Sequence, residues 1–199
     1  MEQRHRCKGI SLLAIVIVTL LIPTQATSEN SVFYVESMHV EDAQAGKKTI
    51  ELDDDGNIYA SFGNTLYKFD AMGNILSEQT FAAEILATSI SPDSTRLALT
   101  IRGSSTGEDS TFILSSGDLS TLVSSSATSS NAHLLDWSEN GASIFTNGAE
   151  QGLIQLGRDA LEIDRTYSGN HSSSLVCFDE SYATGHILTI DQDGLILLW

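Results

Sequence analysis

The amino-acid sequence predicts an all-β fold built from about four similar units. Short apolar segments of strand length alternate with turns rich in Asp, Ser, Asn and Gly along most of the chain. Beyond the N-terminal segment, no window sustains the i, i+3, i+4, i+7 apolar pattern with end caps that an α-helix needs. Equivalent apolar residues also recur at a similar spacing of 39, 47 and 43 residues, at Ile58, Leu97, Ile144 and Ile187.

This spacing indicates the kind of unit that repeats. The middle interval is the longest because extra loop residues stand around Gly103 to Ser110. A period of about 40 to 45 residues with several short strands is typical of a β-propeller blade, a small antiparallel sheet that packs against the next one. We therefore expect a β-propeller of about four blade-like repeats within residues 46–199, at approximately 46–81, 82–123, 132–167 and 170–199.

The expected strands follow one order in every unit. The first strand is an apolar run, at residues 49–52, 85–90, 134–137 and 175–178. A turn of acidic or small residues leads to the second strand, at residues 57–62, 96–101, 143–146 and 186–190. A loop then leads to the third strand, at residues 66–69, 111–114, 153–156 and 195–199. A weaker outer strand completes the first three units, at residues 75–81, 119–123 and 161–167.

Residues 1–26 predict a secretory signal peptide. Basic residues Arg4, Arg6 and Lys8 precede an apolar run from Ile10 to Ile22. A membrane-spanning helix needs about 20 apolar residues, and this run is shorter. Its length fits the apolar region of a signal peptide. We expect cleavage after Ala26 and a secreted or extracytoplasmic location. The alternative is an uncleaved N-terminal anchor, which is the only membrane contact we expect.

The N-terminal segment 27–45 bears on whether the ring of repeats closes. Its apolar stretch Ser31–Val35 has the character of a strand that could complete the last unit and close the ring. The alternative is an incomplete ring that belongs to a longer propeller and exposes a sheet edge. The final apolar run at residues 195–199 has no polar residues after it, which favours the incomplete ring.

The charge balance excludes one class of partner. The 199 residues include 10 Lys and Arg against 26 Asp and Glu, which gives a formal net charge of -16. Nucleic-acid binding depends on clustered basic side chains that neutralise phosphates, so we expect no nucleic-acid partner. The hydrophobic content of 41% is sufficient for an ordinary soluble core.

The last unit resembles a WD repeat. The residues that carry this resemblance are Gly169–His171, Leu175–Phe178 and Asp191–Trp199. In that family a Gly-His pair opens the unit, an Asp braces a tight turn and a Trp closes the third strand. Ser91–Asp93 resembles the same family, and Asp55–Tyr59 resembles the repeats of NHL and PQQ-type propellers. The resemblance implies a rigid interaction platform without catalysis, in which the His braces its own blade.

Two acidic segments are the candidates for metal binding. Asp53 and Asp55 precede a Gly, as do Asp191 and Asp193, and carboxylates beside such a turn are ligands that Ca²⁺ prefers. The competing interpretation is a hairpin turn in which the Asp side chain accepts hydrogen bonds from nearby backbone N–H groups. The second interpretation is favoured, so we expect no cofactor and regard bound calcium as the lesser alternative.

The same turns supply the residues with an expected structural role. Asp93, Asp191 and Asp193 are expected to brace turns, and Gly194 is expected to supply a positive φ. Asn170 begins an Asn-His-Ser sequence that matches the N-glycosylation signal, and it lies in an expected loop between units.

The function that these observations favour is an exported, non-catalytic binding or scaffold module. The His-Glu-x-x-His and phosphate-loop patterns do not occur in the sequence, so we assign no catalytic residue and expect the chain not to be an enzyme. The expected partner is a protein or other ligand that loops at one end of the ring bind. Two alternatives stay open: an exported propeller enzyme of quinoprotein-like or glycan-active type, and an assembly factor at the cell envelope.

Overall fold

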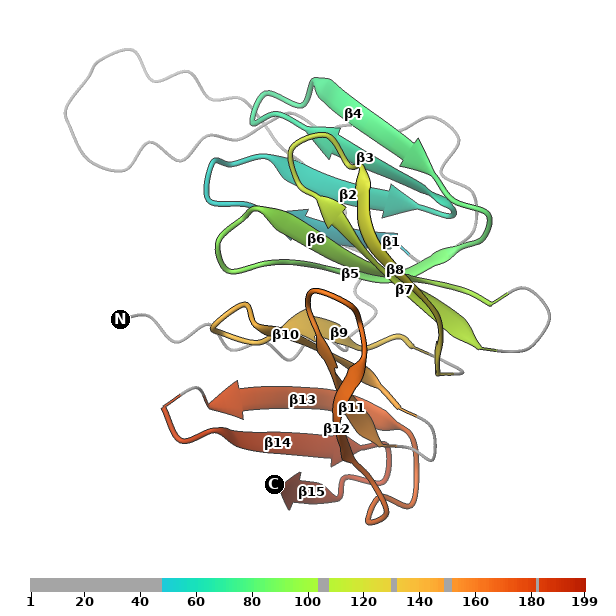
Figure 1. The fold of residues 1–199 in the computed structure, drawn as a ribbon, viewed down its shortest axis with the longest axis vertical. Coiled ribbons are helices and arrows are strands. Elements are labelled where there is room, and N and C mark those ends of the chain that lie inside the picture. The colour runs from blue at the N-terminus through green and yellow to red at the C-terminus, as the bar shows by residue number, and fades with distance from the viewer. Residues whose placement is uncertain (1–47, 104–107, 130–131, 149–151, 182) are drawn as a thin grey trace.

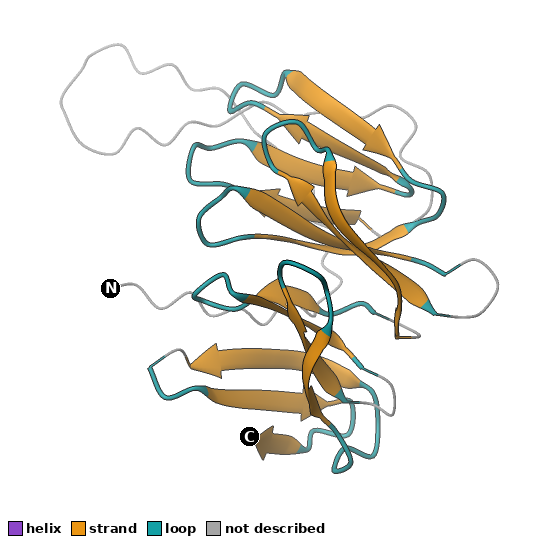
Figure 2. Cartoon of the chain, in the orientation of Figure 1, coloured by secondary structure: helices purple, strands orange, loops and turns teal. Residues whose placement is uncertain are grey.

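The computed structural model describes residues 48–103, 108–129, 132–148, 152–181 and 183–199. Every regular element in these ranges is a β-strand (Figure 2), so the prediction of an all-β fold is confirmed there. No helix capable of crossing a membrane occurs in the described ranges. The expected signal peptide, the segment 27–45 and the expected closing strand at residues 31–35 lie outside them.

The strands form four antiparallel sheets in chain order, each with the form of a propeller blade. Sheet 1 contains β1 (Lys48–Leu52), β2 (Ile58–Phe62), β3 (Thr65–Phe69) and β4 (Ile75–Thr80). Sheet 2 contains β5 (Ile85–Ile90), β6 (Arg96–Ile101), β7 (Asp109–Ser115) and β8 (Thr121–Ser129). Sheet 3 contains β9 (Leu135–Trp137), β10 (Ser143–Asn147), β11 (Leu153–Gly157) and β12 (Ile163–Tyr167). Sheet 4 contains β13 (Leu175–Ser181), β14 (His186–Asp191) and β15 (Ile196–Leu198).

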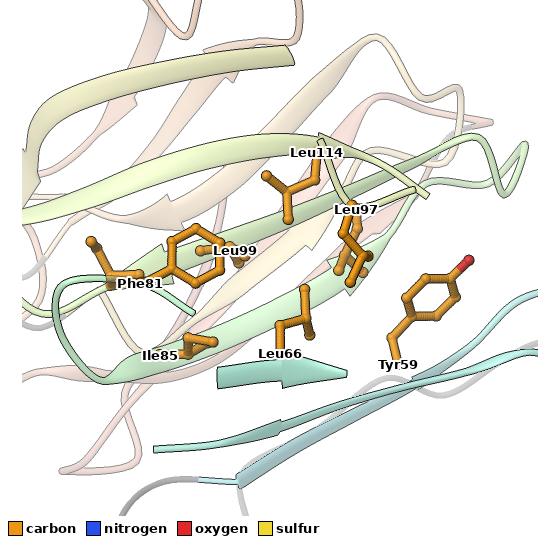
Figure 3. Packing of buried hydrophobic residues seen from close by; sticks show 9 residues of the cluster. Tyr59, Leu66, Phe81, Ile85, Leu97, Leu99 and Leu114 are labelled. Atoms are coloured by element: carbon orange, nitrogen blue, oxygen red, sulfur yellow. The ribbon is translucent and has the colours of Figure 1, made fainter. Parts of the chain in front are cut away.

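The sheets stack face to face in the order of the chain. Figure 1 shows sheet 1 at the top and sheet 4 at the bottom, and the first strand β5 of sheet 2 lies beside both β1 and β9. Each boundary between neighbouring sheets holds its own apolar core. Figure 3 shows the first of these cores, where Tyr59 and Leu66 of sheet 1 meet Leu97, Leu99 and other residues of sheet 2.

The inner sheets bury both faces, because successive side chains of a strand point to opposite sides. In β6, Leu97 and Leu99 pack against sheet 1 while Ala98 between them packs against sheet 3. In β10, Ile144 packs towards sheet 2 and Phe145 towards sheet 4. Two-sided burial explains why apolar residues stand at consecutive positions in these strands, as at Leu97 to Leu99 and at Ile144 and Phe145.

The antiparallel order divides the loops between two ends of the stack. The turns that join the first strand of a sheet to the second, and the third to the fourth, lie at one end, which we call the turn end. The loops that join the second strand to the third, and one sheet to the next, lie at the opposite end, which we call the connection end. Among the described residues, no strand of sheet 4 pairs with a strand of sheet 1, and these two sheets lie at opposite ends of the stack (Figure 1).

Two expected outer strands begin later in the structure than in the sequence-based prediction. Leu119 and Leu161, the expected first residues of those strands, lie in turns with φ of 63° and 56°. The N–H of Leu119 donates to the carbonyl of Ser115 over 2.9 Å, and the N–H of Leu161 donates to the carbonyl of Gly157 over 2.8 Å. The positive φ directs both side chains into a core between two sheets. Leu119 is 0% exposed there and Leu161 is 3% exposed. The strands then start at Thr121 and Ile163.

Candidate functional site

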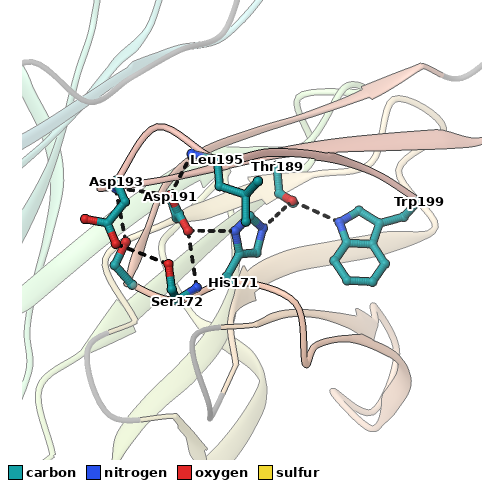
Figure 4. A network of polar contacts seen from close by, with 8 residues as sticks. His171, Ser172, Thr189, Asp191, Asp193, Leu195 and Trp199 are labelled. Carbon is teal, nitrogen blue, oxygen red and sulfur yellow. Dashed lines mark hydrogen bonds and ion pairs between the residues drawn. The ribbon is translucent and has the colours of Figure 1, made fainter.

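The candidate site is a buried polar network at the connection end of sheet 4, which we call the His171 network (Figure 4). Nε1 of Trp199 donates to Oγ1 of Thr189 over 2.9 Å. Oγ1 of Thr189 lies 2.7 Å from Nε2 of His171, and Nδ1 of His171 lies 3.1 Å from Oδ2 of Asp191. The side chains of His171 and Asp191 are only 2% and 0% exposed. The network therefore joins the β12–β13 connection to β14 and to the residue after β15.

The donors and acceptors of this network can be assigned consistently. The indole of Trp199 can only donate and the carboxylate of Asp191 can only accept. The hydroxyl of Thr189 therefore accepts from Trp199 and donates to Nε2 of His171, and Nδ1–H of His171 donates to Asp191. Assigned from the network in this way, both ring nitrogens of His171 and the Thr189 hydroxyl have partners.

Asp191 also braces the turn that follows β14. Its Oδ1 accepts from the backbone N–H groups of Asp193 over 3.1 Å and Leu195 over 2.9 Å. Burial raises the pKa of the Asp191 carboxyl, but the hydrogen bonds from Leu195 and His171 outweigh burial, so the pKa is lowered overall. Gly194 closes this turn with a φ of +82°, a conformation that glycine adopts without strain. The carboxylate of Asp193 accepts from the Ser172 hydroxyl over 3.2 Å.

Asp53 holds a similar turn between β1 and β2, at the turn end of sheet 1. Its Oδ1 accepts from the N–H groups of Asp55 over 3.0 Å and Asn57 over 2.7 Å. Its Oδ2 accepts from the side-chain amide of Asn57 over 2.8 Å and from the Tyr59 hydroxyl over 3.0 Å. Burial raises the pKa of Asp53, and the hydrogen bonds from Asn57 and Tyr59 outweigh it, so the pKa is lowered. Asp55 contributes its backbone N–H, and the residue is exposed.

The two pairs of metal candidates do not meet. Asp53 and Asp55 lie at the turn end of sheet 1, whereas Asp191 and Asp193 lie at the connection end of sheet 4. In the part of the chain that the structure describes, no group of three or more His, Cys, Asp or Glu side chains is arranged to hold a metal ion. Each pair serves a hairpin turn in this geometry.

Asp93 and Asp118 occupy equivalent positions in two turns of sheet 2. Oδ1 of Asp93 accepts from the Ser91 hydroxyl over 2.6 Å and from the Thr95 N–H over 3.1 Å. The hydrogen bond from Ser91 lowers the pKa of Asp93. Hydrogen bonds from the side chain and backbone of Ser120 lower the pKa of Asp118 to about 2. Ionised carboxylates thus recur as turn braces along the turn end.

The structure contains a polar contact between sheets 1 and 2 that the sequence did not predict. The Tyr59 hydroxyl lies 3.0 Å from both Oδ2 of Asp53 and the carbonyl of Ser116. Nζ of Lys68 donates to the carbonyl of Gly117 over 3.2 Å and lies 5.6 Å from the centre of the Tyr59 ring. Burial and the Asp53 carboxylate raise the pKa of Tyr59. The strand pattern marks Tyr59 only as an apolar residue, so it holds no signal for this contact.

Asn170, the expected glycosylation acceptor, is exposed in the β12–β13 connection. It directly precedes His171, whose side chain turns into the network. The exposed amide and the buried imidazole thus come from neighbouring residues of one loop.

Sheet 3 carries an incomplete counterpart of the His171 network. Thr146 is fully buried on β10, the strand equivalent to β14, and its hydroxyl has no hydrogen-bond partner among the described residues. His133, which precedes β9, lies 3.1 Å from the carbonyl of Leu175. Sheet 4 therefore satisfies a buried hydroxyl that sheet 3 leaves unsatisfied.

Comparison with known proteins adds no assignment: no protein-family model matches the chain, and no curated protein matches it.

Proposed function

We propose that this chain is an exported, non-catalytic, WD-repeat-like β-propeller module that binds another protein or ligand through the loops at one end of its sheets. The observation that best supports the proposal is the His171 network. In this network, contacts run from Trp199 through Thr189 and His171 to Asp191. These contacts fit a WD-like unit, in which a Gly-His segment begins the unit and a Trp ends its third strand. A catalytic acid or base faces a cleft, whereas His171 and Asp191 are buried and bonded to their own framework.

The turn end is the proposed binding end. Hydrogen bonds or ion pairs link neighbouring sheets along this end, so its turns are held in fixed positions. The links include Asp54 N–H to Ser94 Oγ at 3.2 Å, Arg96 to Asp159 at 3.2 Å, and Glu139 N–H to Glu180 Oε2 at 3.0 Å. A rim that is already ordered loses little conformational entropy when a partner binds. Its many carboxylates would repel an anionic partner.

Site-directed photo-crosslinking tests this proposal. A photoreactive residue at exposed Asp54 or Asp159 samples the turn end, and the same residue at exposed Gln192 or Glu108 provides a matched control at the connection end. The full chain is exposed to the extracytoplasmic fraction of its source cells. We expect both turn-end positions to capture the same partner and both control positions to capture none. Capture from neither end, or from the control positions only, would contradict the proposal.

The alternative of a propeller enzyme is tested by a calcium titration. A quinoprotein-like enzyme would need a calcium site, so added Ca²⁺ would raise the melting temperature of such a chain. For a binding module whose acidic turns are internally hydrogen-bonded, we expect the melting temperature with millimolar Ca²⁺ to match that with Mg²⁺. A shift in melting temperature that is specific to Ca²⁺ would favour the propeller enzyme.

The crosslinking experiment addresses the other alternative. Capture of envelope assembly components would favour the assembly factor.

The proposed export is tested on the N-terminus. N-terminal sequencing of the protein recovered outside the cytoplasm is expected to begin at Thr27, the residue after the proposed cleavage site. Recovery of the chain in the membrane fraction with residues 1–26 still attached would instead support the uncleaved anchor.

A further inference from the structure

The β12–β13 connection presents an Asn side chain that the fold does not use. Residues 168–170 are all exposed. Among the described residues, no hydrogen bond involves the side-chain amide of Asn170. The space beside the preceding residue is open as well, since a Cβ at Gly169 would meet no atom within 4 Å apart from its chain neighbours. A large group attached to the amide of Asn170 would therefore lie in solvent and displace no contact of the fold.

The two residues that follow Asn170 are held firmly by the fold (Figure 4). The His171 side chain is 2% exposed and lies 3.1 Å from Oδ2 of Asp191. The Ser172 hydroxyl donates to Oδ2 of Asp193 over 3.2 Å, and the Ser172 N–H donates to Oδ2 of Asp191 over 3.4 Å. The turn between β14 and β15 thus fixes both residues, while the residue before them stays free of contacts.

Residues 170–172 form the sequence Asn-His-Ser, which matches the acceptor signal for N-glycosylation of exported proteins. No other Asn in the chain is followed two positions later by Ser or Thr. We infer that Asn170 carries an N-linked oligosaccharide, and that the sugar is transferred before the β14–β15 turn closes over Ser172. The inference rests on the proposed export of the chain, because this modification belongs to exported proteins.

The transfer step takes its sugar from a lipid-linked oligosaccharide. Nδ2 of Asn170 attacks the first carbon of the sugar, and a bond between nitrogen and carbon forms. The bond from that carbon to the phosphate oxygen of the lipid carrier breaks, and the phosphate leaves with the electron pair of this bond. The amide gives up one proton to a base of the transferase. Nothing is oxidised or reduced in this step.

The order of events follows from the hydrogen bonds of Ser172. The transferase must reach the Asn together with the hydroxyl two residues later. In the folded chain that hydroxyl is bonded to Asp193, and His171 between the two is buried. Asp191 and Asp193 stand 19 and 21 residues beyond Ser172, so these bonds form only when the later strands have folded back. The chain therefore accepts the sugar while sheet 4 is open and ceases to do so once sheet 4 has closed.

The position of the sugar is compatible with the proposed binding end. Asn170 lies at the connection end, whereas the proposed binding surface is at the turn end, on the opposite side of the sheets. An oligosaccharide on Asn170 would therefore leave the turn end uncovered.

Intact-mass spectrometry of the full chain from its source cells tests the site. We expect the exported chain to exceed the mass of the polypeptide, and we expect Asn170→Gln and Ser172→Ala to lose this excess. Ser172→Thr is the matched control, because it keeps the hydroxyl and should keep the sugar. An exported chain without excess mass, or an excess that Asn170→Gln retains, would overturn this inference alone. A chain found only in the cytoplasm would overturn the proposed export and this inference with it.

Transfer in vitro tests the order of events. The unglycosylated full chain is added to transferase-containing membranes of its source cells, either folded or diluted directly from urea. We expect at least tenfold more sugar on the chain diluted from urea, and equal amounts would overturn the proposed order.

A substitution then tests the part played by the Ser172–Asp193 hydrogen bond. Asp193→Ala frees the Ser172 hydroxyl and is expected to raise transfer to the folded chain by at least threefold. Asp55→Ala is the matched control, because it removes an exposed carboxylate at the turn end of sheet 1. Equal transfer to the two variants would show that this hydrogen bond does not limit the reaction. Far-UV circular dichroism establishes that each variant remains folded.

Discussion

At the scale of single residues, buried hydroxyl groups distinguish sheet 4 from sheet 3. Thr189 accepts from Trp199 and donates to His171, whereas Thr146 on the equivalent strand lacks a partner among the described residues. Thr189→Val is expected to destabilise the protein by about 1–3 kcal/mol, because it leaves two buried polar groups unsatisfied. Thr146→Val is expected to stabilise the protein by about 1 kcal/mol, because it removes a buried hydroxyl that no hydrogen bond compensates. Urea unfolding measures both changes.

The hydroxyl itself is the control for this pair. Thr189→Ser keeps the oxygen and removes a methyl group, so it should cost less than Thr189→Val. If the two Val variants shift stability in the same direction, the partners assigned to these two residues are wrong.

Glu180 is a residue whose charge works against the fold. Burial raises the pKa of this carboxyl, and the charges of Glu139, Asp136 and Asp179 raise it further, although the Glu139 N–H lowers it. A carboxyl with a raised folded-state pKa destabilises the protein above that pKa and ceases to do so once it is protonated. Glu180→Gln is therefore expected to raise the melting temperature by ~1–2 °C at pH 7 and to leave it unchanged at pH 3. An equal shift at both pH values would mean that charge is not the cause.

At the scale of structural elements, two leucines with a positive φ lie in turns and place their side chains in the apolar cores between sheets. Leu119 lies in the β7–β8 turn and is fully buried between sheets 1 and 2. Leu119→Ala is expected to destabilise the protein by about 2–4 kcal/mol, because it creates a cavity while keeping the unusual backbone conformation. Leu122→Ala, three residues further on, removes a side chain that is 51% exposed and should change stability by less than about 0.5 kcal/mol. Similar values for the two variants in urea unfolding would contradict the burial of Leu119.

Most strands could be predicted from the sequence, because local patterns of apolar and turn residues define them. The strands expected at residues 85–90 and 96–101 coincide with β5 and β6, because turn residues at each end and apolar residues between them act over a few positions. The expected start at Leu119 was wrong, because an apolar residue carries no local signal for a left-handed turn.

Contacts between sheets were less accessible to sequence analysis. Tyr59 meets the Ser116 carbonyl across 57 residues of chain, and no property of either residue alone indicates the other. His171 and Trp199 could be singled out because both stand in the segments that resemble a WD repeat. Their shared partner Thr189 could not, because a Thr within a strand is ordinary.

At the scale of the whole molecule, the turn carboxylates determine how the fold responds to acid. Among the described residues, the pKa values of five Asp side chains are lowered: Asp53, Asp70, Asp93, Asp118 and Asp191. A carboxyl whose pKa is lowered by folding stabilises the protein at pH values above its unfolded pKa of about 3.9, and this stability is lost as the pH falls towards the folded value. We therefore expect the free energy of unfolding to vary little between pH 7 and pH 5 and to fall steeply between about pH 4 and pH 2.

Salt separates this effect from the general repulsion of an acidic chain. Added salt screens distant charges, whereas the hydrogen bonds at each turn are local and are screened much less. The loss of stability between pH 4 and pH 2 should therefore persist in 0.5 M NaCl. Asp118→Asn keeps an acceptor for Ser120 but cannot ionise, so it should make this loss shallower. Urea unfolding across the pH range measures the effect, and stability that stays constant down to pH 2 would show that the braced turns contribute nothing through their charge.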